Sequence, residues 1–177
     1  MNSLLWDHAG RLDDEALRTL LCEAESIINS RPLSTENLAD PSAEVLTPNH
    51  ILTMKSRVVL SPPGAFTSED IYCRKRWRAV QYLANQFWSR WKNEYLMSLQ
   101  QRSKWTAVKR NFQVNDVVLV KDEDSARNCW PLGRIQKVHA SSDELVRSVD
   151  VRCAGENLTR PIHKLVLLVG VEEDFSK

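Results

Sequence analysis

Five short apolar runs in the last third of the chain decide the fold: VVLVK (residues 117–121), LGRIQKVH (132–139), LVRSVDVRC (145–153), LTRPI (158–162) and LVLLV (165–169). Each run has the length of a strand and is rich in β-branched residues. Polar or turn-forming residues, such as those of the acidic turn at 122–124, separate the runs. Five short strands joined by turns are typical of a small β-barrel. We therefore expect a barrel in residues 114–171, followed by a short tail, 172–177.

Two helices are predicted in the N-terminal third. Apolar residues recur at three- and four-residue spacing between residues 12 and 31, which indicates an amphipathic helix. Asp13 is its expected N-cap, and Pro32 ends it. Further on, Thr47 and Pro48 provide an N-cap and a first helical residue for a short helix. We therefore expect residues 1–53 to form a helical segment whose two helices are separated by a polar stretch at 33–46.

The longest predicted helix lies between these segments and the strands. After a linker at residues 54–67, Ser68 and the two acids that follow it are expected to cap a helix that runs to about Leu99. No proline or glycine interrupts this stretch. We assign residues 68–113 to the long helix and its connector. The predicted fold class is α+β.

Charge is distributed unevenly, although the net formal charge is only +1. Residues 71–113 contain ten Lys or Arg and a single acid, Glu94, whereas residues 1–70 contain five basic and eleven acidic residues. Clustered cations neutralise phosphates and release counterions, which gives affinity for nucleic acid without sequence preference. Engagement of about six phosphates would weaken binding on the order of a thousandfold between 50 and 200 mM salt. The alternative interpretation is a solvated helix face.

The long helix has two predicted faces. Its apolar stripe contains Trp77, Val80, Ala84, Phe87 and Trp91, and its polar stripe contains Arg74, Lys75, Arg78, Asn85, Ser89 and Lys92. Tryptophans could stack on bases, but their helical spacing favours packing in a core. An alternative function is therefore a protein-interaction or oligomerisation module, in which the tryptophan stripe pairs helices of two subunits.

Several stretches resemble the C-terminal end of integrases from BEL/Pao long-terminal-repeat retrotransposons. The resemblance is carried by AESIINSRPL (24–33), LTPNHIL (46–52), RKRWR (74–78), QFWSRW (86–91), DVVLV (116–120), WPLGR (130–134) and RPIHKL (160–165). It implies that residues 1–53 are the last helices of the catalytic core, that a basic helix follows, and that the barrel is SH3-like. Asn115 stands where the family usually has a glycine before the first strand.

The resemblance also implies that the chain lacks catalytic activity. Integrases of this family use two aspartates and one glutamate to hold two divalent metals, and these acids would lie upstream of Met1. We find no phosphate-cradling glycine loop or nucleophile motif, and the four cysteines lack zinc-ligand spacing. We therefore expect no cofactor, no metal and no enzyme activity. The expected partners are DNA without sequence preference, another copy of the chain, or an integrase core.

The candidate DNA-binding residues are the cations of the basic block and of the barrel: Arg74, Lys75, Arg76, Arg78, Arg90, Lys92, Arg102, Lys104, Lys109, Arg110, Arg134, Lys137, Arg147, Arg152 and Arg160. Arg74 to Arg78 also resembles a nuclear-import cluster. The sequence lacks a signal peptide, and its longest apolar run is five residues, too short to span a bilayer. We therefore expect an intracellular protein of the nucleus or cytoplasm, with no membrane partner.

Overall fold

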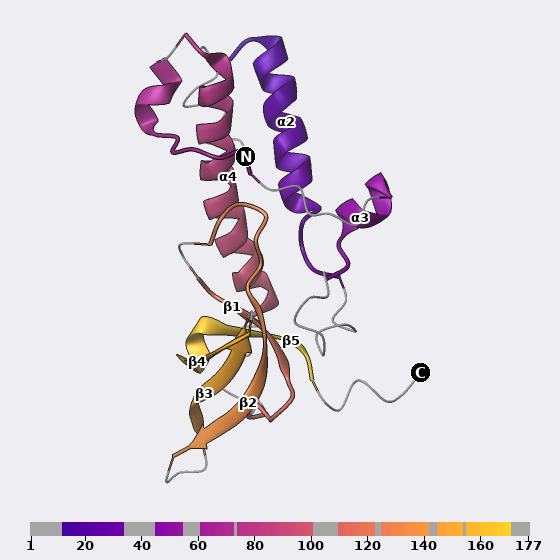
Figure 1. The fold of residues 1–177 in the computed structure, drawn as a ribbon, viewed down its shortest axis with the longest axis vertical. Helices are drawn as coiled ribbons and strands as arrows, with labels where there is room; N and C mark the ends of the chain where they lie inside the picture. The colour runs from indigo at the N-terminus through magenta and orange to yellow at the C-terminus, as the bar shows by residue number, and fades with distance from the viewer. Residues whose placement is uncertain are drawn as a thin grey trace. The chain divides into compact units, whose positions relative to one another are not determined.

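Helices and a five-stranded antiparallel sheet make up an α+β fold in the computed structural model (Figure 1). The structure describes residues 12–33, 45–54, 61–72, 74–100, 110–122, 125–141, 145–153 and 155–170. The chain divides into two compact units. The first unit contains Met1–Arg31, Thr47–Glu94 and Ala126–Cys129, and the second contains Pro32–Leu46, Tyr95–Ser125 and Trp130–Lys177.

The two helices predicted in the N-terminal third are present in the first unit. Helix α2 (Asp14–Ile28) begins as expected, because Oδ1 of Asp13 accepts a hydrogen bond of 2.9 Å from the backbone N–H of Ala16. Helix α3 (Pro48–Thr53) has Thr47 as its N-cap, and Thr47 and His50 form a reciprocal capping box. The buried residues of α2 recur at three- and four-residue spacing: Ala16, Leu20, Ala24 and Ile27.

The long helix begins later than predicted. Helix α4 spans Arg76–Leu99, and Ser68–Tyr72 form a separate 3-10 helix, η1. A continuous helix would separate residues 70 and 78 by about 12 Å along its axis. In the structure, however, Nε of Arg78 lies 2.6 Å from Oδ1 of Asp70. This ion pair requires the chain to fold back before α4, so Ser68 does not cap the helix.

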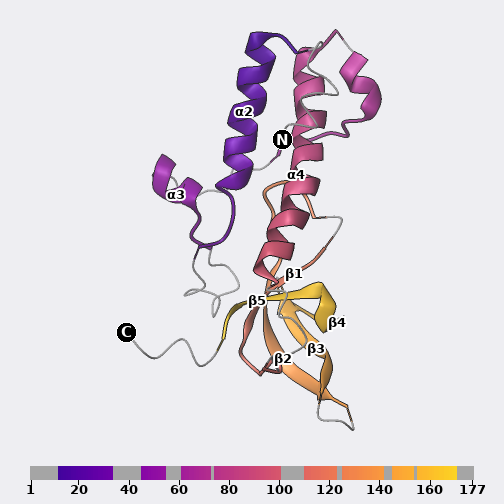
Figure 2. The same ribbon diagram turned by 180° about the vertical axis from the view of Figure 1, so that it is seen from behind.

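The sheet belongs to the second unit and has the order β4-β3-β2-β1-β5. Its strands, all antiparallel to their neighbours, are β1 (Val117–Val120), β2 (Leu132–Ala140), β3 (Val146–Cys153), β4 (Glu156–Pro161) and β5 (Leu165–Val169). These bounds differ from the predicted runs by at most two residues. A 3-10 helix, η2 (Ile162–Lys164), joins β4 to β5. Among the described residues, β4 and β5 are edge strands that do not pair, so the predicted closure into a barrel is not observed. Figure 2 shows the five strands from behind.

Strand β1 is buried on both faces, which explains its uninterrupted apolar sequence. On one face, Val118 and Val120 join the main core of the sheet, whose other members are Ile135, Val146, Val149, Val151 and Leu165. On the opposite face, Leu119 packs with Val166 and with Leu96 from the last turns of α4. These last turns therefore cover the sheet over β1 and β5.

Two positions in or next to the strands restrict which residue type the backbone can accept. Asn115 has φ 75°, a left-handed conformation that asparagine tolerates better than most residues, so it replaces glycine at little cost. Gly133 packs so closely on β3 that an added Cβ would overlap the side chain of Val151. No helix in the described ranges is both long enough and apolar enough to cross a membrane.

Candidate nucleic-acid interface

Three cations of the second unit share the sheet surface that lies opposite the main core. The register places Arg134 of β2 directly across from Arg152 of β3, and Lys137 across from Asp150. Residues directly opposite each other in an antiparallel pair project from the same face. Positions 134 and 137 would project from opposite faces of a regular strand, but a register shift between Ile135 and Lys137 brings both to one face.

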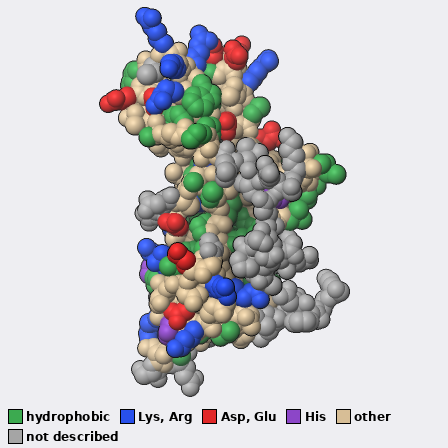
Figure 3. All heavy atoms as spheres, viewed as in Figure 1, with side chains coloured by type: hydrophobic (Ala, Val, Ile, Leu, Met, Phe, Trp, Pro, Cys, Tyr) green, Lys and Arg blue, Asp and Glu red, His purple; other side chains and the backbone are tan. Residues whose placement is uncertain are grey.

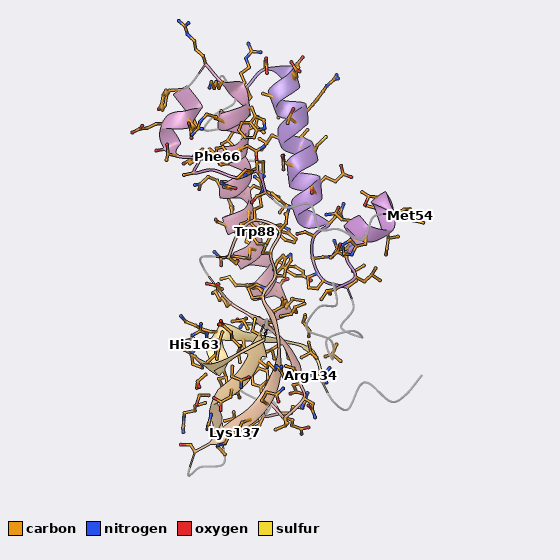
Figure 4. The ribbon with its side chains drawn as sticks, viewed as in Figure 1. Met54, Phe66, Trp88, Arg134, Lys137 and His163 are labelled. Carbon is orange, nitrogen blue, oxygen red and sulfur yellow. The ribbon has the colours of Figure 1, made fainter. Side chains whose placement is uncertain are left out.

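We call this surface the outer face and define it by Arg134, Lys137, Arg152, Asp150 and Thr159, the last lying opposite Asp150 on β4. The alternating residues Ile135 and Val151 are fully buried in the main core. Figure 4 labels Arg134 and Lys137 along β2.

The two arginines of the outer face, Arg134 and Arg152, form no ion pair with any acidic side chain in the described ranges. Nε of Arg134 is buried and has no hydrogen-bond partner. Like charges at directly opposite positions of neighbouring strands destabilise a sheet. A bound anion would remove this repulsion.

Asp150 adds a negative charge to the outer face, but its carboxylate is bonded to groups other than the two arginines. Oδ1 of Asp150 accepts a hydrogen bond of 2.7 Å from Oγ1 of Thr159 and lies 3.0 Å from Nε2 of His139. The hydrogen bond from His139, followed by that from Thr159, lowers the pKa of Asp150. The nearby charge of Lys137 lowers this pKa further. The outer face therefore carries three cations and one internally bonded carboxylate.

The basic block of α4 is largely neutralised within the first unit. Arg78 donates to both carboxylate oxygens of Asp70 and to the carbonyl of Ala65, and the hydrogen bond from Arg78 is the main cause of the lowered pKa of Asp70. Arg76 pairs with Asp13, and Arg90 pairs with Glu94 one turn further along the helix.

The remaining predicted cations of the basic block differ in accessibility. Lys92, predicted on the exposed polar stripe, is only 5% exposed, and its Nζ lies 5.5 Å from the centroid of the Trp88 ring. The prediction of an exposed Lys92 is wrong, because α4 buries more than one stripe. Arg74 and Lys75 are exposed. Arg102, Lys104 and Lys109 lie outside the described residues.

The other predicted cations of the second unit do not extend the outer face. Arg110 forms an ion pair of 3.0 Å with the fully buried Asp116. Arg160 lies opposite Val149, on the core side of β4, and is half-buried. Arg147 is exposed near the start of β3. Of the cations predicted on the strands, Arg134, Lys137 and Arg152 are those that the structure brings together.

The tryptophan stripe of α4 is partly internal. Val80, Ala84 and Phe87 are buried, as the helical spacing predicted, and Trp88, which was not assigned to the stripe, is buried too. Trp77 is the exception among the described tryptophans, because half of its side chain is exposed.

A buried polar cluster in the first unit was missed by sequence analysis. Arg127 is 4% exposed and donates hydrogen bonds to Gln81 and Asn85 of α4, with lengths of 2.6 and 3.3 Å. Its guanidinium also pairs with Glu23 of α2 at 3.3 Å. Burial lowers the pKa of Arg127, and Glu23 partly opposes that shift. No sequence signal distinguishes this arginine from an exposed loop cation.

The described part of the chain also contains potential metal-ligating and thiol side chains. Within those ranges, no group of three or more His, Cys, Asp or Glu side chains is placed to hold a metal ion. Cys22, Cys129 and Cys153 are free thiols, and burial is the main cause of the raised pKa of Cys153.

Comparison with known proteins gives one match. The family model that describes DUF5641, a family of unknown function, matches residues 75–168, which are more than half of the 177 residues. The matched segment includes all of α4 and the whole outer face. No curated protein and no solved structure matches the chain.

Proposed function

The chain belongs to DUF5641, a family of unknown function, and we propose that it binds nucleic acid through the outer face, with duplex DNA as the ligand. The observation that supports this proposal is the juxtaposition of Arg134 and Arg152, which lie on one face of neighbouring strands and pair with no acid among the residues that the structure describes. Arginine side chains bind phosphate oxygens through a planar fork of N–H donors. A DNA backbone would supply the missing anions.

Non-specific backbone recognition suits this surface better than base reading. The aromatic residues in the described part of 110–170 are Phe112 and Trp130, and both pack against hydrophobic cores. The outer face thus offers cations without exposed rings on which bases could stack. We infer that Arg134, Lys137 and Arg152 contact phosphates, which a duplex displays at regular spacing.

We further propose that the second unit is an SH3-like barrel and that the chain is the non-catalytic C-terminal part of a BEL/Pao-type integrase. The five antiparallel strands, their order and the shared core support the SH3-like interpretation. The integrase interpretation is supported by the stretches of sequence that resemble that family. In this proposal the protein acts in the nucleus, holds DNA during integration, and leaves phosphodiester chemistry to a separate catalytic core. The alternative of oligomerisation through the tryptophan stripe has less support, because Phe87 and Trp88 are buried within the first unit.

The proposal is tested by measuring the affinity of the full chain for a fluorescent 20-base-pair duplex by anisotropy. We expect Arg134→Gln and Arg152→Gln each to weaken binding about fivefold to tenfold at 0.1 M salt, since each removes about one released counterion. Glutamine keeps a polar side chain of similar shape, and circular dichroism would verify that the variants stay folded.

Arg18→Gln is the matched control, because Arg18 is exposed on α2 and its loss changes the net charge by the same amount. We expect Arg18→Gln to bind within about twofold of the parent chain, since it leaves the phosphate contacts intact. Equal effects of all three substitutions would mean that net charge, rather than the outer face, determines binding. Undiminished affinity in the Arg134 and Arg152 variants would reject the proposal.

A further inference from the structure

An exposed aromatic ring lies beside uncompensated cations where α4 begins. Half of the Trp77 side chain is exposed, although its ring contacts Phe66 edge to face, with centroids 5.4 Å apart. Tyr72, at the end of η1, is 74% exposed. Tryptophan has a large apolar surface, so leaving half of it in water forgoes stability that burial would provide. No contact among the described residues of the first unit requires this exposure.

Trp77 is held in a fixed environment by its neighbours. The guanidinium of Arg78 lies 5.5 Å from the centroid of the Phe66 ring and is itself bound to Asp70 and to the carbonyl of Ala65. Asp70 in turn accepts a hydrogen bond of 2.8 Å from the backbone N–H of Thr67. Because these contacts order Phe66, the ring pair is organised before any ligand arrives.

The positive charge next to Trp77 indicates which kind of ligand would bind over its exposed ring. Arg74 and Lys75 are exposed and form no ion pair with a side chain in the described ranges. Figure 3 shows hydrophobic and basic side chains adjoining one another at this end of α4. A second copy of the chain would present the same positive charge, so self-association through this surface would be repulsive. The surface fits a ligand that combines a flat π-system with negative charge.

We propose that Trp77 stacks on an unpaired base of a nucleic acid strand whose phosphates are bound by Arg74 and Lys75. Stacking on an aromatic side chain accepts any base, and adjacent cations track the backbone. One half-exposed indole matches a single base in size. This inference rests on the proposed nucleic-acid function but assigns it a second site, which takes unpaired rather than duplex nucleotides.

The test compares two probes on the full chain, a 12-nucleotide oligothymidylate and a duplex of equal length. We expect Trp77→Leu to weaken oligothymidylate binding about fivefold to tenfold while changing duplex binding less than twofold. Trp77→Phe is the matched control, because it keeps a ring and should retain oligothymidylate binding within about twofold. Arg74→Gln with Lys75→Gln should weaken oligothymidylate binding by about tenfold or more.

A spectroscopic measurement keeps the proposal testable if Trp77→Leu does not fold. The difference between the emission spectra of the parent chain and Trp77→Phe isolates the Trp77 signal, which oligothymidylate should quench. Absence of that quenching would overturn the inference, as would equal losses for both probes in Trp77→Leu. Binding of phosphatidylserine vesicles, but not oligothymidylate, through Trp77 would replace it with a membrane contact.

The failure of this inference can be distinguished from that of the proposed function. Loss of duplex binding in the Arg134 and Arg152 variants, with no effect of Trp77→Leu on either probe, would retain the outer face and reject the second site. Oligothymidylate binding that depends on Trp77, without measurable duplex binding, would retain the second site and reject the outer face.

Discussion

Replacement of Arg127 by alanine should destabilise the first unit. The side chain of Arg127 is 2% exposed and binds Gln81, Asn85 and Glu23. Removing one member of a buried ion pair typically costs about 3–5 kcal/mol. The Glu23 side chain is 26% exposed and regains some hydration, so we expect the lower end of that range, about 3 kcal/mol. In a chain of this size, such a loss corresponds to a decrease in Tm of about 6–12 °C.

Urea unfolding monitored by circular dichroism would measure this loss as a change in the free energy of unfolding. Arg127→Met separates packing from polar contacts, because methionine retains much of the aliphatic volume and makes none of the hydrogen bonds. A double-mutant cycle with Glu23→Ala should give a coupling energy of about 1–3 kcal/mol. A loss below about 1 kcal/mol in Arg127→Ala, or parent-like stability in Arg127→Met, would refute the assigned role of the polar cluster.

Three further predictions concern stability. Gly133→Ala should lower the free energy of unfolding by about 1–3 kcal/mol, because the new Cβ would overlap Val151; an unchanged urea midpoint would contradict this close packing. Asn115→Gly should leave Tm unchanged or raise it slightly and Asn115→Val should lower it, because φ is 75° at this position. Thermal melts in which the valine variant has the higher Tm would contradict this positive φ. The pKa of Asp70 is lower in the folded chain than in the unfolded chain, where it is about 4. The ionised carboxylate therefore stabilises the folded chain above the unfolded pKa, and this stabilisation is lost as pH falls through the folded pKa. The stability difference between the parent chain and Asp70→Asn should therefore shrink toward pH 3, and a difference independent of pH would contradict the Arg78 contact.

Local signals allowed the secondary structure to be predicted closely. Asp13, Thr47 and Pro48 are capping residues that act within one helical turn, and helices α2 and α3 begin where these residues indicate. The five strands follow runs of β-branched residues, and β5 matches its predicted bounds. The predicted start of the long helix at Ser68 was wrong, because the Asp70–Arg78 ion pair depends on tertiary structure.

For the outer face, the sequence predicted which residues take part but not how they are arranged. The sequence indicated that Arg134, Lys137 and Arg152 were candidates, but their common face depends on strand register and on a bulge that no residue pattern marks. The charge of residues 71–113 overstated the exposed cationic surface, since Arg76, Arg78 and Arg90 pair with acids that lie upstream, or one helical turn away. Counting charges along a chain cannot reveal which of them tertiary contacts neutralise.

The most direct measurement of the central claim is the salt dependence of duplex binding by the parent chain and by Arg152→Gln. Three phosphate contacts, from Arg134, Lys137 and Arg152, predict a slope of log K against log salt of about −2.7, which is a loss of about fortyfold between 50 and 200 mM. Arg152→Gln should reduce the slope by about 0.9. A flat salt response, or an identical slope in Arg152→Gln, would contradict phosphate binding at the outer face.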